Sequence, residues 1–534
     1  MLWQLLPEKL FGNIVTTYEA PLPEEVIQLI AQHEKRELKD ITAVIVVDGF
    51  QEFQETTVDG LDEKWEFYRT LTAFADLAIQ KMFIIPCCTA TITCSIKNFL
   101  RSSHRKRIFL PVASLKPPYI RQDSVLKPVF NDEDYIMKIL INDCGGHGRA
   151  LEVLAECLSQ VDISQDNIDE LMHELFNRMK DRYKEALLSV SKYANAIARA
   201  ILTRKPLPFD EPVPETNRLP YEITQPGLIR YEREEDSPVG YLTAPYIWIW
   251  LLARRSSSMT DPILRDWRFC DYSEHRSIED PRSPPGAQFW QHFEHFVASF
   301  RCLKSRLIGE GELVTVSEVH AGARLNGDFS FINHHLELEC STYQEDTKST
   351  NRSSDNWEVK CEYATVNIRD CKFCVLNGSS ASAGDAFLGL DTGPGSTPIN
   401  EVHQYKHLKT QIMNENRFKT ERDKAASAND FFFLFTTAKD CNFRIPERSG
   451  IIDGNNWAKY FGPFAGRAYL YAIEGPLNIN SAKRHDLLRM DGIGKTYADQ
   501  IIKKRPFVDI EDAKAKTNIP ERVLKRFKFS STPV

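Results

Sequence analysis

The chain has 534 residues and a net charge of −7, and its apolar and charged fractions are those of an ordinary globular protein. Its length is enough for three or four domains. The longest strongly apolar run, residues 244–253, is too short to cross a bilayer, so no membrane partner is expected. The N-terminus lacks a secretory signal and the 12 cysteines form no short framework, which predicts reduced thiols in an intracellular compartment.

Residues 1–155 are predicted to form a parallel α/β domain. Two apolar runs, 41–47 and 83–91, are typical of strands buried on both faces of a parallel sheet. Asp48 follows the first run, where a nucleotide-hydrolysing domain places the aspartate that holds Mg²⁺; the alternative is a strand-end aspartate in a turn. Arg149 ends a glycine-rich segment that resembles the lid opening of many signalling ATPases, where arginine reaches the nucleotide phosphates.

A complete nucleotide site is not expected. No Gly-x-x-x-x-Gly-Lys-Ser/Thr loop occurs in the chain. The strand and loop that cradle phosphates would lie upstream of Met1. We therefore interpret Asp48 and Arg149 as cofactor-binding positions of a partial P-loop NTPase-like domain without its Walker A loop, and ATP is not expected as a cofactor.

Residues 156–255 are predicted to form a helical lid followed by a winged-helix-like region. Apolar residues at helical spacing indicate one helix of the lid, namely Ile168, Leu171, Leu175 and Met179. Residues 227–248 carry a hairpin pattern. The polar, proline-punctuated residues 256–286 are expected to be a linker.

Residues 287–470 are predicted to form an α+β domain like the PD-(D/E)XK restriction endonucleases. An amphipathic helix opens the domain, with His292, Glu294 and His295 expected on its exposed face. The strand patterns that follow cover residues 313–319, 328–339, 357–366, 373–376, 386–390 and 430–437. A helix followed by several strands that end near acids suits a nuclease core.

Nucleases of this kind need an aspartate on one strand and, on the next, an acid or glutamine two residues before a lysine. The first two bind Mg²⁺, and the lysine helps to generate or orient the hydroxide nucleophile. The preferred set is Asp385 with Gln404 and Lys406, because Asp385 precedes an apolar strand and a turn-rich loop leads to the other two. Asp385 and Gln404 would hold the expected Mg²⁺, with Gln404 the weaker ligand because it is neutral.

Two other sets stay open at this point. One joins Asp328 to Glu358 and Lys360; the other joins Asp328 to Glu337 and Glu339 and lacks a lysine. Short acid–lysine patterns also arise by chance in any charged domain. In that case the lysine is a surface residue and the aspartate caps a turn.

The C-terminal segment, residues 476–529, is predicted to be an all-helical helix-hairpin-helix module that binds DNA phosphates. A P-loop needs a glycine five positions before Gly494, where Arg489 stands, and both flanks have helical periodicity. The glycines therefore join two helices, whose turn and second N-terminus attract a phosphate without reading sequence. The predicted contact residues are Gly492, Ile493, Gly494, Lys495 and Thr496.

Charge is unevenly distributed along the chain. Residues 478–529 hold 13 Lys and Arg against 7 Asp and Glu, a net charge of +6, so the remainder carries −13. A small basic module at the end of an acidic protein is the footprint of a phosphate-backbone binder. The backbone of double-stranded DNA is the expected partner; the alternative is a solvated, charge-rich tail.

Several stretches resemble the crinkler effectors and the related retrotransposon-hot-spot proteins, namely residues 46–49, 67–73, 85–91, 104–118 and 143–152. The resemblance extends over essentially the whole chain. It implies a multidomain α/β architecture in which a P-loop NTPase is joined to a restriction-endonuclease-like nuclease. Here a ComEA-type helix-hairpin-helix follows.

The resemblance also implies a nuclease-type effector that acts on DNA in the nucleus, with Asp385, Gln404 and Lys406 in the metal and catalytic roles. Such an effector is secreted and translocated into a host cell, although no delivery header is recognisable in this chain. The alternative is a catalytically inactive DNA-binding effector that recruits partners in the nucleus. A regulatory NTPase fragment is a third reading, against which the missing phosphate loop argues.

Overall fold

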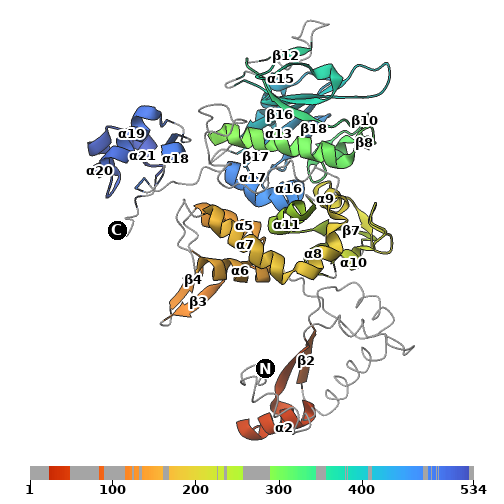
Figure 1. The fold of residues 1–534 in the computed structure, drawn as a ribbon, viewed down its shortest axis with the longest axis vertical. Helices are drawn as coiled ribbons and strands as arrows, with labels where there is room; N and C mark the ends of the chain where they lie inside the picture. Colours follow the sequence, from red (N-terminus) through yellow and green to blue (C-terminus); the bar gives the residue numbers. More distant parts are fainter. Residues whose placement is uncertain are drawn as a thin grey trace. The chain divides into compact units, whose positions relative to one another are not determined.

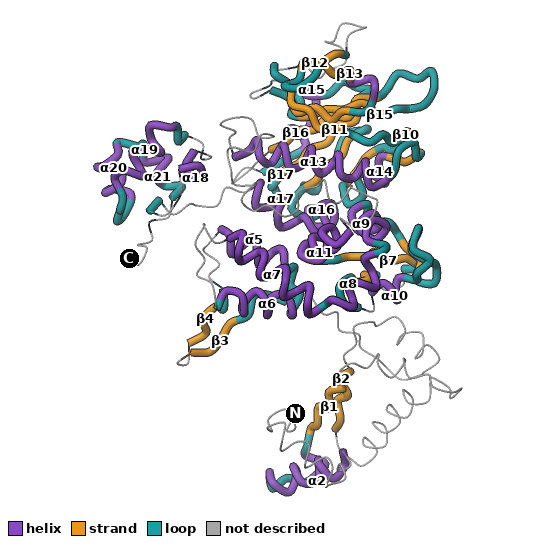
Figure 2. The backbone as a smooth tube through the Cα atoms, viewed as in Figure 1, coloured by secondary structure: helices purple, strands orange, loops and turns teal. Residues whose placement is uncertain are grey.

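The protein is described from a computed structural model, shown in Figures 1 and 2. The described residues are 23–47, 83–88, 115–122, 125–130, 135–159, 168–224, 226–233, 237–256, 289–343, 345, 357–378, 381, 383–406, 412–439, 441–472, 479–480, 482, 484–488, 490, 492–527 and 529. The chain divides into two compact units, Met1–Leu110 and Pro111–Val534. It is a mixed α/β protein with a seven-stranded mixed sheet.

The first unit contains a parallel pair of strands, as the apolar runs predict. β1 (Thr42–Val47) pairs with β2 (Phe83–Cys88), and α2 (Pro23–Glu34) and the short η2 (Leu38–Asp40) precede them. The side chains of Val44, Val46, Phe83 and Ile85 are exposed. The expectation of strands buried on both faces is therefore wrong for the described residues. Among the described elements, only α2 and η2 supply residues that pack against this pair of strands.

A mainly helical region begins the second unit. Its strands β3 (Tyr119–Gln122) and β4 (Val125–Pro128) form an antiparallel pair. Its helices are α5 (Tyr135–Asp143), α6 (Gly148–Leu158), α7 (Ile168–Arg182), α8 (Lys184–Ser191), α9 (Ala194–Leu202), α10 (Pro220–Thr224) and α11 (Tyr246–Ser256). In α7, Leu171, Leu175 and Met179 are buried, which confirms the predicted stripe.

The hairpin predicted within residues 227–248 is also present. β6 (Arg230–Glu232) pairs antiparallel with β7 (Val239–Thr243), and β5 (Leu207–Pro208) lies on the other side of β7. The helical region shares one hydrophobic core with the large sheet that follows.

The large sheet has the strand order β11 (Glu337–Cys340), β14 (Phe373–Leu376), β15 (Ala386–Leu390), β16 (Ile399–Lys406), β17 (Phe431–Thr436), β18 (Ser449–Ile452) and β9 (Arg324–Asn326). β14, β15 and β16 are antiparallel neighbours, and β16, β17 and β18 run parallel. Two-stranded pairs lie outside it, formed by β8 (Leu313–Thr315) with β10 (Ser330–Ile332) and by β12 (Glu358–Lys360) with β13 (Thr365–Asn367).

The predicted strand over residues 313–319 is only half right. It ends at Thr315, where the short helix α14 (Val316–Val319) begins. Thr315 accepts a hydrogen bond from the backbone of Glu318, whose carboxylate accepts one from the backbone of Thr315 in return. This reciprocal capping box favours a helix over the continued strand that the valines predict.

Helices cover both faces of the large sheet (Figure 1). α13 (Phe289–Ile308), α16 (Trp457–Phe461) and α17 (Ala465–Ala472), with the short η6 (Gly462–Phe464), pack into the core on one face. α15 (Glu415–Ala425) packs against the other face, together with the β12–β13 pair and the short η5 (Ile368–Asp370). Side chains of a strand alternate between the faces, so β16 presents one set of residues to α13 and the other to α15.

The C-terminal residues form a small helical module with its own core. Its helices are α18 (Arg484–Leu488), α19 (Lys495–Lys504), α20 (Ile510–Thr517) and α21 (Glu521–Leu524). The core contains Ile479, Leu487, Met490, Ile493, Ala498, Ile501, Phe507 and six further apolar residues. Among the described helices of the chain, none is both long and apolar enough to span a membrane.

Candidate functional site

Strands β15 and β16 bring the preferred acid and amide together. Asp385 immediately precedes β15, and its backbone N–H donates to the carbonyl of His403 in β16. The Oδ2 atom of Asp385 accepts hydrogen bonds from Nε2 of Gln404 and from the backbone N–H of Tyr405, both at 2.6 Å. The antiparallel register of the two strands thus places an aspartate and a glutamine side by side on one face of the sheet.

Burial dominates the electrostatics of Asp385. It raises the pKa of this carboxyl to about 6, although the hydrogen bond from Tyr405 and the charge of Lys406 lower it. Glu421 raises the pKa further. The carboxyl of Asp385 is thus held in surroundings that disfavour its ionised form.

Lys406 lies at the end of β16, two residues beyond Gln404, on the same face. Its Nζ is 3.3 Å from Oε2 of Glu421, which comes from α15. The Lys406 side chain keeps 29% of its surface exposed and that of Glu421 only 11%. The structure therefore groups Asp385, Gln404 and Lys406, and it adds Glu421 to them; we call these four residues the Asp385 site.

Glu294 belongs beside this site, although the sequence placed it on an exposed helix face. It is partly buried in α13. Burial raises the pKa of Glu294 well above its ordinary value, and the charge of Asp385 raises it further while Lys406 lowers it. The amphipathic pattern of residues 289–308 predicts the helix but not which of its residues lie near Asp385, so no sequence signal singled out Glu294 or Glu421.

The alternative sets built on Asp328 are not gathered in this way. The carboxylate of Asp328 accepts hydrogen bonds from the backbone N–H and the hydroxyl of Ser317, at 3.1 and 2.6 Å, at the start of α14. Glu358 and Lys360 lie exposed on β12. Asp328 thus has a capping role, and no described contact joins it to Glu358 or Lys360.

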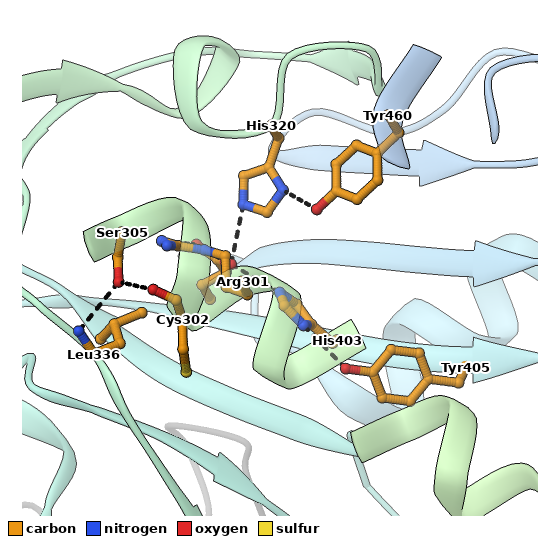
Figure 3. Close-up of polar contacts among 9 residues, drawn as sticks. Arg301, Cys302, Ser305, His320, Leu336, His403, Tyr405 and Tyr460 are labelled. Carbon is orange, nitrogen blue, oxygen red and sulfur yellow. Dashed lines mark hydrogen bonds and ion pairs between the residues drawn. The ribbon is translucent and has the colours of Figure 1, made fainter. Parts of the chain in front are cut away.

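A second polar cluster lies on the opposite face of β16 (Figure 3). Oε1 of Glu401 is 3.1 Å from Nε2 of His320 and 2.7 Å from Nε2 of His403. The other ring nitrogens of His320 and His403 contact the hydroxyls of Tyr460 and Tyr405, at 3.1 and 3.2 Å. All of these residues are buried.

Arg301 of α13 completes the second cluster, which we call the Arg301 network. Its guanidinium donates to both carboxylate oxygens of Glu401, at 3.0 and 3.2 Å. Burial lowers the pKa of His320 to about 3, so this ring is neutral at physiological pH. Burial, with Arg301 adding to it, also lowers the pKa of the neighbouring Lys304 to about 7.

The ligand atoms of His320, Glu401 and His403 lie within 4.8 Å of one another, and within the described part of the chain only this group of three or more His, Cys, Asp or Glu residues has such a geometry. Arg301 already neutralises Glu401, however, and a divalent ion would add charge beside a buried guanidinium. We therefore interpret the Arg301 network as a structural network rather than a metal site.

The glycine turn of the C-terminal module leaves a helix start open. Gly492 has φ +82°, a left-handed conformation that glycine adopts without strain. Gly494 precedes α19 without a side-chain cap, and a Cβ atom there would meet nothing within 4 Å. The free N–H groups at the start of α19 are thus accessible to an acceptor.

The neighbours of these glycines divide between core and surface. Lys495 and Thr496 are exposed. Ile493 is buried in the core of the module, and its backbone N–H donates to the carbonyl of Met490. Of the five predicted contact residues, Ile493 therefore holds the turn, while the other four lie on its open side.

Of the two predicted nucleotide-binding residues, the structure describes only Arg149. Asp48 lies outside the described residues. Arg149 is exposed on α6, where its guanidinium donates to Glu152 at 2.7 Å. This pair is an ordinary i,i+3 contact on a helix surface, which contributes a few tenths of a kcal/mol at most, on the order of 0.2–0.5.

Comparison with known proteins gives one match. The chain is 32% identical over 501 residues to the crinkler effector protein 108 of Phytophthora sojae, which covers 89% of this chain and 56% of that protein. The chain thus spans little more than half the length of this curated relative. No protein-family model matches the chain. No solved structure matches it. The similarity supports a crinkler-like family for the chain.

Proposed function

We propose that the chain is a crinkler-type effector that binds DNA and, through residues 287–470, cleaves it with Mg²⁺. The similarity to a crinkler effector over most of the chain supports the effector assignment. The nucleus of a host cell, reached after secretion and translocation, is the proposed place of action. ATP hydrolysis is not part of the proposal.

The order of elements around Asp385 supports a nuclease of the restriction-endonuclease type. α13 is followed, after β8 to β13, by three antiparallel neighbours, β14, β15 and β16. The chain then continues to α15 and to β17, which is parallel to β16. A helix followed by several strands that end near acids is what we expect of such a nuclease core from the sequence. The observed order places the aspartate before the second of the three antiparallel strands and the lysine at the end of the third.

The observation that carries the proposal is the meeting of Asp385, Gln404 and Lys406 on adjacent strands. Asp385 and the amide oxygen of Gln404 would hold Mg²⁺, and the charge of Asp385 raises the pKa of the nearby Glu294. The ion, when bound, offsets negative charge on the phosphate and makes a water molecule more acidic. Lys406 would orient that water or stabilise the charge that develops on the phosphate.

The C-terminal module would anchor the enzyme to the DNA backbone. The uncapped start of α19 presents backbone N–H groups, Gly494 leaves room for a phosphate, and Lys495 adds positive charge. Such contacts fix position without reading bases, so affinity for duplex DNA should fall as salt rises.

A cleavage assay with duplex DNA, with and without Mg²⁺, tests the proposal. Lys406→Ala should lower metal-dependent cleavage by roughly a hundredfold or more, as loss of one positioned charge-stabilising group does. Lys419→Ala is the matched control, because Lys419 is an exposed lysine on α15 that pairs only with Glu415 in the described contacts. Cleavage that survives in a clean preparation of the Lys406 variant would rule out this site.

A catalytically inactive DNA-binding effector is the second candidate. It is favoured by the way the polar groups of the Asp385 site satisfy one another: Asp385 accepts from Gln404, and Lys406 pairs with Glu421. In this case the wild-type chain binds duplex DNA in a salt-dependent way and leaves it uncut at every Mg²⁺ concentration.

A further inference from the structure

α15 carries one charged residue among its buried positions. The buried residues of this helix are Phe418, Glu421 and Ala425, spaced three and four residues apart. Phe418 and Ala425 pack in the hydrophobic core beneath the sheet. A carboxylate in this stripe loses hydration, which is costly unless a partner compensates for it.

The partner of Glu421 is Lys406, the residue proposed to act in catalysis. Their charged atoms are 3.3 Å apart, and the exposed Lys424 approaches the other carboxylate oxygen at 4.0 Å. The charge of Glu421 is also felt at Asp385. One helix thus holds an acid against the end of β16, within electrostatic reach of the aspartate on the neighbouring strand.

The nature of residue 404 explains why this acid matters. The motif accepts either an acid or a glutamine two residues before the lysine, and this chain has Gln404. The amide of Gln404 donates to Asp385 and offers no negative charge to Lys406. The negative charge beside Lys406 comes from α15 instead of from its own strand.

We propose that Glu421 is the positioning residue for Lys406, holding its ammonium group at the Asp385 site in place of an acid at position 404. The role rests on the proposed nuclease function. Without Glu421 the four-carbon stem of Lys406, which is partly exposed, turns freely into solvent. A misplaced catalytic group costs rate even when the fold and the DNA contacts are intact.

Steady-state cleavage of duplex DNA tests the role in the reaction. Glu421→Gln should lower kcat about tenfold or more and leave KM and DNA affinity within about twofold, because the proposed anchor to the DNA backbone is the C-terminal module and Glu421 is given no contact with DNA. Glu421→Asp keeps the carboxylate and should recover part of kcat. Glu415→Gln, which removes an exposed acid from the same helix, is the control and should leave kcat unchanged.

Competitive acylation of lysine amines, read by mass spectrometry of the peptide that contains Lys406, tests the pairing itself. Lys406 should react at least about threefold faster in Glu421→Gln than in the wild-type chain, whereas Lys419 should react at the same rate in both. Should the Gln variant fail to fold, Glu421→Asp gives the same comparison with an intermediate rate.

These two measurements separate the inference from the function. If the wild-type chain does not cleave DNA while Lys406 is protected by Glu421, the nuclease proposal falls and the pairing stands. If the wild-type chain cleaves but Glu421→Gln cleaves equally well, or if Lys406 reacts at an unchanged rate, the positioning role is overturned.

Discussion

The two faces of β16 carry two polar clusters, each with a buried carboxyl group, and the pKa values of these two carboxyl groups shift in opposite directions. On the α13 face, Glu401 accepts two hydrogen bonds from the guanidinium of Arg301 and contacts the rings of His320 and His403, and these partners hold the pKa of Glu401 well below its ordinary value despite burial. On the α15 face, burial raises the pKa of Asp385 to about 6.

This difference separates a structural network from a site. Both carboxylate oxygens of Glu401 are bound, and a buried charge that is paired in this way holds one arrangement of the chain. A buried acid whose pKa is raised is held in a costly state, which is typical of positions kept for function rather than for stability. Alternate residues of β16 thus lie in different electrostatic surroundings: Glu401 and His403 face the Arg301 network, and Gln404 and Lys406 face the Asp385 site.

The largest expected effect comes from opening the Arg301 network. Glu401→Gln leaves the guanidinium of Arg301 buried without a counter-charge, which should lower the free energy of unfolding by about 3–5 kcal/mol. Chemical denaturation at pH 7.5 measures this change. Glu415→Gln, at an exposed position of α15, should change stability by less than about 0.5 kcal/mol. If Glu401→Gln lowers the free energy of unfolding no more than the control does, the carboxylate of Glu401 does not stabilise the fold, and the contrast with Asp385 is lost.

The Asp385 site should respond with the opposite sign. Because the pKa of Asp385 rises from 3.8 to about 6 on folding, its ionised form destabilises the folded chain at neutral pH. Asp385→Asn keeps acceptors for Gln404 and Tyr405 and removes the charge. It should raise the free energy of unfolding at pH 7.5 by up to about 3 kcal/mol while abolishing cleavage.

The pH dependence of the stability gained by Asp385→Asn tests whether the charge of Asp385 is its cause. Below pH 3.8 the wild-type carboxyl is protonated in both the folded and the unfolded chain, so the advantage of Asp385→Asn should vanish as the pH falls from 6 to below 4. Unfolding curves of the wild-type chain and of Asp385→Asn, each recorded at pH 7.5 and 4.5, measure how far this stability difference decreases. An advantage that does not depend on pH would show that charge is not its cause.

Much of this comparison could be read from the sequence, and some could not. The apolar runs at 373–376 and 386–390 match β14 and β15 to the residue, because short runs flanked by turn residues fix strand ends well. The pairing of Asp385 with Gln404 follows from that register. The predicted strand over 313–319 is partly wrong, because the capping box formed by Thr315 and Glu318 starts a helix where strand propensity predicts a continued strand.

The residues that complete the site were hidden because their role depends on tertiary packing. The sequence of α15 is polar, with charged residues on every side of the helix. Glu421 becomes buried only because α15 packs on the sheet. The Arg301 network is equally non-local, since Arg301, His320, Glu401 and Tyr460 come from four separate elements. Sequence periodicity finds the elements, whereas the partner of a buried charge appears only when they pack.

The smallest expected effect concerns His320, the neutral histidine of the Arg301 network, and the dependence of stability on pH. Burial lowers the pKa of His320 from 6.5 to about 3, so the unfolded chain binds a proton more readily than the folded chain between these values. The stability that depends on a neutral His320 is complete above pH 6.5 and should fall by about 2 kcal/mol between pH 6.5 and pH 5. His320→Gln can still donate to Glu401 but does not titrate, so unfolding curves of this variant should show a flatter acid slope. If the slopes of the two proteins coincide, His320 is not held neutral, and the contrast with Asp385, whose stability contribution changes in the opposite direction over the same pH range, fails with it.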